Sequence, residues 1–118
     1  MRSGASRKAE STVEWSHDVL QLTWEEVAEI LGTTSRTLQR WREQGTTPLR
    51  ENAEKVEKLD ELRFWLETVF EGDWEQARQW LNTRLLDLRG KTPMDVVRQQ
   101  RIDKVIEFLA TAHAGAFI

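Results

Sequence analysis

The stretch that decides the fold is LGTTSRTLQRWREQG, residues 31–45, which joins two helical patterns across a glycine turn. It holds four hydroxyl residues, three arginines and one tryptophan within fifteen positions. Thr34 is placed to cap a helix whose apolar face would consist of Leu38 and Trp41, and Gly45 is placed to end it. We therefore expect a short amphipathic helix with a basic outer face.

The segment before this stretch has the form of a helix start. In Thr23-Trp24-Glu25-Glu26, the threonine hydroxyl can accept from a backbone amide while Glu26 reaches back to the cap. Apolar residues follow at helical spacing, and Gly32 would end the helix at the turn. The small side chain of Ala28 would allow the two helices to cross closely. Two helices joined by a tight glycine turn, the second one basic, are typical of a helix-turn-helix that binds DNA.

The outer face of the second helix is the candidate DNA-reading surface. At about 100° per residue, its polar side chains point away from Leu38 and Trp41. Arginine can bridge guanine O6 and N7, glutamine can bridge adenine N6 and N7, and hydroxyls and amides near a helix start can hold phosphates. The DNA-binding residues that we expect are Thr33, Thr34, Ser35, Arg36, Thr37, Gln39 and Arg40.

Glu43 belongs to the same polar row and has two candidate partners. It can accept from cytosine N4, but we expect it to pair with Arg40 one turn earlier. For the whole stretch, the alternative to DNA binding is a helical hairpin whose arginines are only solvated. Local charge favours DNA binding, because residues 33–50 carry four arginines against one acid. By contrast, residues 51–77 carry nine acids against three basic residues.

Apart from the first segment, almost every segment of the remaining sequence shows helical spacing. Residues 1–12 are small, polar and slightly basic, and we expect a flexible tail. A first helix over residues 13–20 would brace a helix-turn-helix domain of residues 13–48. Thr47-Pro48 restarts the chain, and apolar residues at three- and four-residue steps predict a linking amphipathic helix over 49–71. The expected fold class is all-α, with a helix-turn-helix bundle, a long linking helix and a small helical domain.

The small helical domain would comprise residues 72–118. Gly72 would break the linking helix and Asp73 would cap the next one. Thr92-Pro93-Met94-Asp95 supplies a cap, a first-turn proline and an acid near a helix start. The apolar residues expected on one face of a final helix are Ile102, Val105, Ile106 and Leu109. The tryptophans expected to pack in the core are Trp24, Trp41, Trp65, Trp74 and Trp80.

Composition argues against several classes of function. The chain of 118 residues has no cysteine and two histidines, so thiolate chemistry is excluded and a metal site is not expected. A formal net charge of -3 argues against nonspecific coating of nucleic acid. No nucleophile, base and orienting acid occur with a recognisable spacing, and no apolar run is long enough for a membrane span. We expect a cytoplasmic protein that is not an enzyme and needs no cofactor.

Three motifs of the last domain resemble a known family. They are WEQARQWLNT at 74–83, KTPMDVV at 91–97 and VIEFLATAHAGAFI at 105–118. Together they are similar to the toxin-binding domain of the Xre/MbcA/ParS antitoxins, and the amino-terminal half is similar to the Xre-type helix-turn-helix found in the same proteins. The matching positions are Ala77, Trp80, Leu81, Asn82, Pro93, Met94, Asp95, Val105, Leu109 and Gly115.

The resemblance implies a type II antitoxin that binds its toxin directly. The implied partner is a RES-type toxin, an enzyme that degrades NAD, and the implied second partner is operator DNA, through which the antitoxin represses its own operon. A homodimer or larger assembly is expected, because a helix-turn-helix usually reads two half-sites. The toxin-binding residues that the resemblance implies are Val105, Leu109, Ala112, Gly115, Phe117 and Ile118. For the apolar tail, docking on the protein's own core is the alternative.

The chain departs from the family pattern before its last helix. Family members usually have a glycine-rich bend there, whereas this chain reads RQQR over residues 98–101 and is one residue shorter. With Lys104 this turn is basic, which could serve an acidic partner surface or be solvated. The alternative function for the whole chain is a stand-alone helix-turn-helix transcription regulator or a helical adaptor without a toxin partner.

Overall fold

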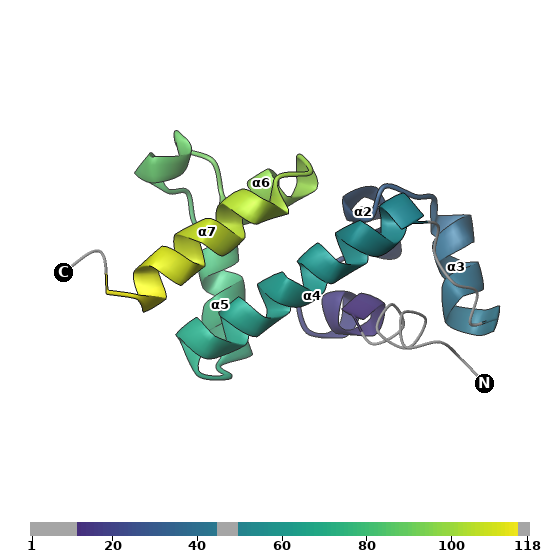
Figure 1. The fold of residues 1–118 in the computed structure, drawn as a ribbon, viewed down its shortest axis with the longest axis horizontal. Coiled ribbons are helices and arrows are strands. Elements are labelled where there is room, and N and C mark those ends of the chain that lie inside the picture. The colour runs from purple at the N-terminus through teal and green to yellow at the C-terminus, as the bar shows by residue number, and fades with distance from the viewer. Residues whose placement is uncertain (1–11, 45–49, 116–118) are drawn as a thin grey trace. The chain divides into compact units, whose positions relative to one another are not determined.

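The computed structural model describes residues 12–44 and 50–115, and its elements there are helical (Figure 1). Residues 12–18 form a first helical segment. The elements that follow are α2 (Trp24–Ile30), α3 (Ser35–Gln44), α4 (Arg50–Phe70), α5 (Trp74–Leu81), the short 3-10 helix η1 (Leu86–Leu88), α6 (Pro93–Arg98) and α7 (Ile102–His113). The extended pairing in the described residues is an isolated bridge between Leu85 and Lys91. The all-α prediction is confirmed.

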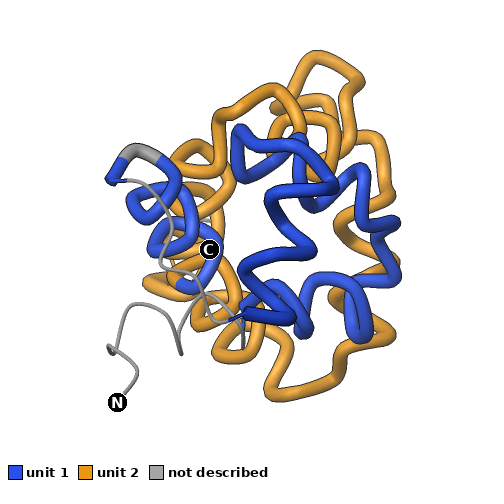
Figure 2. The backbone as a smooth tube through the Cα atoms, turned by 90° about the vertical axis from the view of Figure 1, so that its right-hand side faces the viewer, with its two compact units in different colours: residues 1–60 blue, residues 61–118 orange. Residues whose placement is uncertain are grey.

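The chain divides into two compact units, unit 1 (residues 1–60) and unit 2 (residues 61–118), as Figure 2 shows. The division falls inside α4, not at either end of the linking helix predicted over 49–71. The reason is that buried residues continue along α4 on both sides of the division, namely Val56, Leu59, Leu62 and Leu66. Each half of this helix therefore belongs to the core of its own unit.

The predicted tail was one residue too long. Thr12 is fully buried and helical, and its hydroxyl donates to Asp60 Oδ1 at 3.2 Å. Within the first helical segment, Ser16 Oγ donates to the Thr12 carbonyl at 2.9 Å. The bond from Thr12 to Asp60 attaches this segment to α4, a contact that residue types alone did not indicate. Gly45 and Thr47-Pro48, for which we predict a helix end and a restart of the chain, lie outside the described residues.

The helix-turn-helix expected around residues 23–44 is present in unit 1. Thr23 and Glu26 form the reciprocal capping box, with Glu26 N to Thr23 Oγ1 at 3.1 Å and Thr23 N to Glu26 Oε1 at 3.0 Å. Ala28 is buried where α2 packs on α3. Gly32 adopts a φ of +69° at the turn, a left-handed conformation that glycine tolerates best.

Asn52 at the start of α4 closes this turn from outside the motif. Its side-chain amide, 6% exposed, donates to the Leu31 carbonyl at 2.9 Å and to the Gly32 carbonyl at 3.2 Å. These carbonyls lie at the end of α2, where the helix itself offers no amide partners. The Lys55 side chain lies against Gly32, so a Cβ at this position would collide with its ammonium group. One turn of α4 thus fixes the turn between α2 and α3.

Unit 2 follows the predicted caps and apolar spacing. Asp73 accepts from Gln76 N at 3.1 Å and begins α5, and Thr92 and Asp95 form a capping box at α6. α6 packs on both α5 and α7. The buried apolar residues of this unit are Leu62, Leu66, Ala77, Leu81, Met94, Val96, Val97, Ile102, Val105, Ile106 and Leu109. The four residues predicted for the inner face of α7 are all among them.

Four described residues other than glycine have left-handed backbones. They are Gln21, Glu71, Arg89 and Gln100, with φ between +53° and +66°. Gln100 lies in the turn from α6 to α7, where the resembling family usually carries glycine. The chain therefore makes this bend with a residue for which the conformation costs about 1 to 2 kcal/mol. Among the described helices, none is both long and apolar enough to cross a membrane.

Candidate functional site

The exposed face of α3 carries the polar row that the helical spacing predicted. Leu38 and Trp41 are buried, at 1% and 4% exposure, on the side that packs against α2. The side chains on the other side are all exposed, namely Arg36, Gln39, Arg40 and Glu43. The apolar pair thus fixes which side chains of α3 are available to a ligand.

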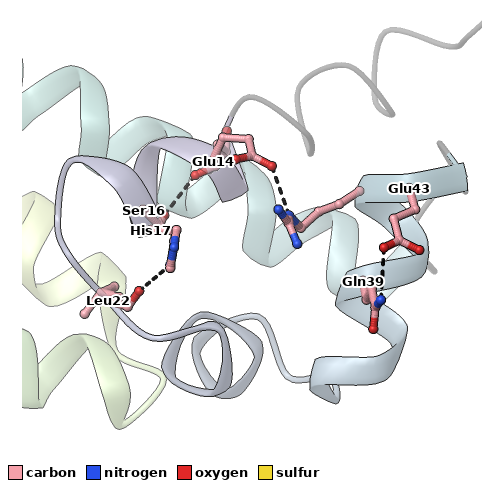
Figure 3. Close-up of polar contacts among 8 residues, drawn as sticks. Glu14, Ser16, His17, Leu22, Gln39 and Glu43 are labelled. Atoms are coloured by element: carbon pink, nitrogen blue, oxygen red, sulfur yellow. Dashed lines mark hydrogen bonds and ion pairs between the residues drawn. The ribbon is translucent and has the colours of Figure 1, made fainter.

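Three of these four exposed side chains are already hydrogen-bonded to a neighbour along the helix. Gln39 Nε2 donates to Glu43 Oε1 at 2.9 Å (Figure 3), and Arg40 Nη2 donates to Thr37 Oγ1 at 3.3 Å. The predicted pairing of Glu43 with Arg40 is therefore wrong, because each side chain has a nearer partner on the same helix. Within the described part of the chain, the Arg36 side chain makes no hydrogen bond or ion pair.

Hydroxyl groups gather at the amino-terminal end of α3. Thr37 N donates to Thr34 Oγ1 at 3.2 Å, which confirms Thr34 as the cap, and the two hydroxyls are 3.1 Å apart. Thr34 is exposed, and Thr33 and Ser35 are half-buried. The structure thus brings all seven predicted DNA-binding residues to one end and one face of α3. The free backbone N–H groups at the start of a helix, together with several hydroxyls, are suited to hold a phosphate.

Arg42 points away from this face and holds α3 from behind. Its guanidinium lies 3.6 Å from the centroid of the Trp24 ring, and its Nε donates to Glu14 Oε1 at 2.9 Å. The His17 ring stacks on Trp24 at 3.7 Å, and its Nδ1 lies 2.8 Å from the Leu22 carbonyl (Figure 3). Two groups this close to one ring centroid must occupy its opposite faces. The resulting Arg42–Trp24–His17 stack ties α3 to α2 and to the first helical segment.

Sequence reasoning missed this stack and the role of Asn52. Trp24 was expected simply to pack in the core, yet it is half-buried between two charged or polar partners. Of the other tryptophans, Trp15 and Trp41 are buried, whereas three in unit 2 are half-buried, namely Trp65, Trp74 and Trp80. An arginine and a tryptophan eighteen positions apart give no local signal of contact, because the turn between α2 and α3 brings them together.

The residues implied for toxin binding separate into three groups. Val105 and Leu109 are buried in unit 2, at 1% and 2% exposure, and Ala112 and Gly115 are half-buried towards the end of α7. Phe117 and Ile118 lie outside the described residues. Ala112 is helical, because α7 continues to His113, and Gly115 has a φ of +78°. The end of α7 is therefore the accessible part of this predicted surface.

The carboxylate of Asp95 anchors the start of α6. Thr92 N donates to Asp95 Oδ2 at 3.2 Å, and Asp95 N donates to Thr92 Oγ1 at 3.0 Å. The hydrogen bonds with Thr92 lower the pKa of Asp95 below 3.8, its ordinary value, and the charges of Arg98 and Arg84 lower it further against the opposing effect of burial. Pro93 and Met94 of the same motif are buried. The motif residues thus serve the local fold of unit 2.

The described residues contain no group of three or more His, Cys, Asp or Glu side chains that could hold a metal ion. The arrangement on α3 is suited to binding through hydrogen bonds and charge.

Comparisons with known proteins agree over both units. Residues 65–115 match a family model described as the antitoxin Xre/MbcA/ParS C-terminal toxin-binding domain. Two relatives named mycobacterial cidal antitoxin MbcA, from Mycobacterium tuberculosis and Mycobacterium bovis, are each 29% identical over 108 residues, 92% of this chain and 94% of theirs. A chain in the crystal structure of the M. tuberculosis MbcT-MbcA toxin-antitoxin complex is 28% identical with a TM-score of 0.67. That match covers 92% of this chain and 96% of the solved one.

Proposed function

We propose, from the premise that residues 65–115 belong to the Xre/MbcA/ParS toxin-binding family, that this protein is the antitoxin of a type II toxin-antitoxin system. It neutralises a RES-type, NAD-degrading toxin by direct binding and represses its own operon through α3. The observation that carries the proposal is the likeness to MbcA across nearly the whole chain, together with MbcA being solved in complex with a toxin.

Toxin binding is assigned to unit 2 and centred on the end of α7. Val105 and Leu109 support the helix from within, since both are buried, and Ala112 and Gly115 present its accessible end. Phe117 and Ile118, which lie outside the described residues, complete the proposed contact, because two adjacent large apolar residues favour a partner that covers them. A small number of apolar anchors commonly carries most of the energy of a protein interface.

Operator binding is assigned to the outer face of α3. Arg36 is exposed and has no internal side-chain partner in the described residues, so its guanidinium can contact a guanine or a phosphate without losing a bond. The hydroxyls at the start of α3 would hold the DNA backbone. A homodimer follows from the two half-sites that such motifs usually read.

The toxin assignment is tested by purifying the tagged full-length protein from its native operon. The expected result is near-stoichiometric recovery of the neighbouring gene's product, lost on deletion of residues 113–118. Deletion of residues 1–11 is the matched control and should leave recovery unchanged. The recovered partner, expressed alone, should lower cellular NAD. A protein recovered alone that still binds its promoter would instead favour the stand-alone regulator.

The DNA assignment is tested by fluorescence anisotropy with a duplex of the protein's own promoter. Arg36→Ala and Arg40→Ala should each weaken binding about tenfold, or about 1.4 kcal/mol, which lies within the range of about 1 to 3 kcal/mol for a good base contact. Wild-type affinity should fall steeply with added salt. Arg84→Ala, an exposed arginine in unit 2, is the control. Unchanged affinity in both α3 variants would remove this helix from the reading role.

A further inference from the structure

A basic pocket of about 290 Å³ opens on unit 2 between the η1 loop and the turn from α6 to α7. Its apolar part consists of Val96, which is buried, and Leu88, which is half-buried. The exposed polar and charged residues that line it are Asp87, Arg89, Lys91, Gln99, Arg101 and Lys104. Four basic side chains against one acid make this a cationic hollow in a chain whose net charge is -3.

Three of the four cations have no partner of their own. In residues 12–44 and 50–115, the side chains of Arg89, Arg101 and Lys104 make no hydrogen bond or ion pair. The fourth, Lys91, donates from Nζ to Gln99 Oε1 at 3.3 Å and so bridges the two walls. Like charges around one hollow repel each other, which is unfavourable. A bound anion would offset this repulsion by attracting each of the cations.

The first wall is a tightly bonded loop that holds its cations in place. Leu85 N donates to the Lys91 carbonyl at 3.1 Å, and Gly90 N donates to the Leu85 carbonyl at 2.9 Å. Inside the loop, Arg89 N donates to the Leu86 carbonyl at 2.9 Å and Lys91 N to the Leu88 carbonyl at 3.1 Å. This backbone does not need to be ordered when a ligand arrives, which lowers the cost of binding.

Each wall contains a residue other than glycine in the left-handed conformation. Arg89 has a φ of +59° and lines the pocket, and Gln100, with a φ of +66°, lies between the lining residues Gln99 and Arg101. Glycine would adopt either conformation with less strain. Strained backbone gathers at sites where a side chain has to be held in one direction. Here it directs cationic side chains from both walls to the same hollow.

We propose that this pocket binds the phosphate or pyrophosphate group of a small molecule. Guanidinium groups match phosphate oxygens with two parallel hydrogen bonds, and lysine ammonium groups add compact charge. The volume lies at the lower end of the range for ligand sites, so the occupant is small. Among the described residues, no aromatic side chain lines the pocket, so these residues offer no surface on which a base would stack. The phosphate group therefore carries the recognition. The residues that line this site belong to unit 2, whereas α3 belongs to unit 1, and pyrophosphate binding here does not depend on the proposed function.

The test is isothermal titration calorimetry of the full-length protein with sodium pyrophosphate, with the ionic strength held constant by sodium chloride. Saturable binding at one site is expected, and Arg89→Gln and Arg101→Gln should each weaken it about tenfold. Arg84→Gln removes an exposed arginine that does not line the pocket, and it should change the affinity less than twofold. Circular dichroism verifies that each variant is folded.

Four outcomes would overturn the proposal. Absence of saturable binding to the wild type, or equal weakening by Arg84→Gln, would reduce the pocket to a solvated basic surface. Citrate binding as tightly as pyrophosphate would remove the preference for phosphate. If both pocket variants bind pyrophosphate normally but lose promoter DNA or the copurified toxin, the cations belong to a macromolecular interface. Because promoter and toxin binding are measured separately, failure here is distinguishable from failure of the proposed function.

Discussion

The two helices to which we assign partner binding, α3 in unit 1 and α7 in unit 2, are held in different ways. α3 buries only Leu38 and Trp41 and is secured at its rear by the Arg42–Trp24–His17 stack. The turn before it is closed by one side-chain amide from α4. α7 instead buries four aliphatic residues along one continuous face. Loss of a single polar contact can therefore loosen α3. α7 is loosened only when a substitution removes part of its buried apolar packing.

The largest expected effect on stability is in α7, which is held by apolar packing. Leu109→Ala, in the fully packed face of α7, should lower the free energy of unfolding by about 3 kcal/mol, because it removes buried methyl groups and leaves a cavity. Urea denaturation followed by circular dichroism measures the change. Glu107→Ala, at an exposed position of the same helix, is the control and should change the free energy of unfolding by less than about 0.5 kcal/mol. Equal losses would show that α7 is not held by its inner face.

The second-largest effect is expected at Asn52, whose side-chain amide closes the turn between α2 and α3 in unit 1. Asn52→Ala should destabilise the protein by about 2 kcal/mol, because two carbonyls at the end of α2 lose a buried donor. The same denaturation measurement applies, with exposed Glu54→Ala on the same helix as the control, expected within about 0.5 kcal/mol of wild type. A cost for Asn52→Ala no larger than that of the control would mean that the amide does not secure the turn.

A smaller and pH-dependent effect is expected at the start of α6. The folded-state pKa of Asp95 is lowered, so its charge stabilises the fold above its ordinary pKa of 3.8 and ceases to do so as pH falls through the folded value. Asp95→Asn should therefore cost about 0.5 to 1 kcal/mol at pH 7, and the difference from wild type should shrink below pH of about 4. Urea midpoints between pH 7 and pH 3 measure this. A difference that is constant with pH would contradict a charge effect.

The smallest effect is a gain in stability. Gln21→Gly should stabilise unit 1 by about 0.5 kcal/mol, because relief of a left-handed φ of +60° exceeds the added chain entropy of glycine. Thermal denaturation should show a slightly raised Tm. Gln79→Gly, also exposed but inside α5, is the matched control with the opposite expected sign. Two losses of similar size would show that the conformation at Gln21 carries no strain.

Local signals predicted most of the helices and their starts. The caps at Thr23, Thr34, Asp73 and Thr92 were all found from residue types within three or four positions, and the inner face of α7 followed from its spacing. These features depend on neighbours along the chain. The polar row of α3 was predicted for the same reason, since burial of Leu38 and Trp41 fixes the opposite face.

The contacts that were missed join residues far apart in sequence. Asn52 acts twenty-one positions from Leu31, and the Glu14 partner of Arg42 lies twenty-eight positions away. Neither pairing has a local pattern, because each depends on how helices pack after they form. The predicted pairing of Glu43 with Arg40 was wrong for another reason, although the two residues are close in sequence. Both Arg40 and Gln39 were within reach of it, and charge alone favoured the arginine.

The bonds along the outer face of α3 give this surface two kinds of side chain. Gln39 and Arg40 each give one N–H to a neighbour on the helix, so a ligand that engages their remaining donors meets side chains whose directions are already set. Arg36 has no such bond within the described residues and can turn to suit a ligand. The outer face thus combines one adaptable arginine with neighbours that are positioned before any ligand is present.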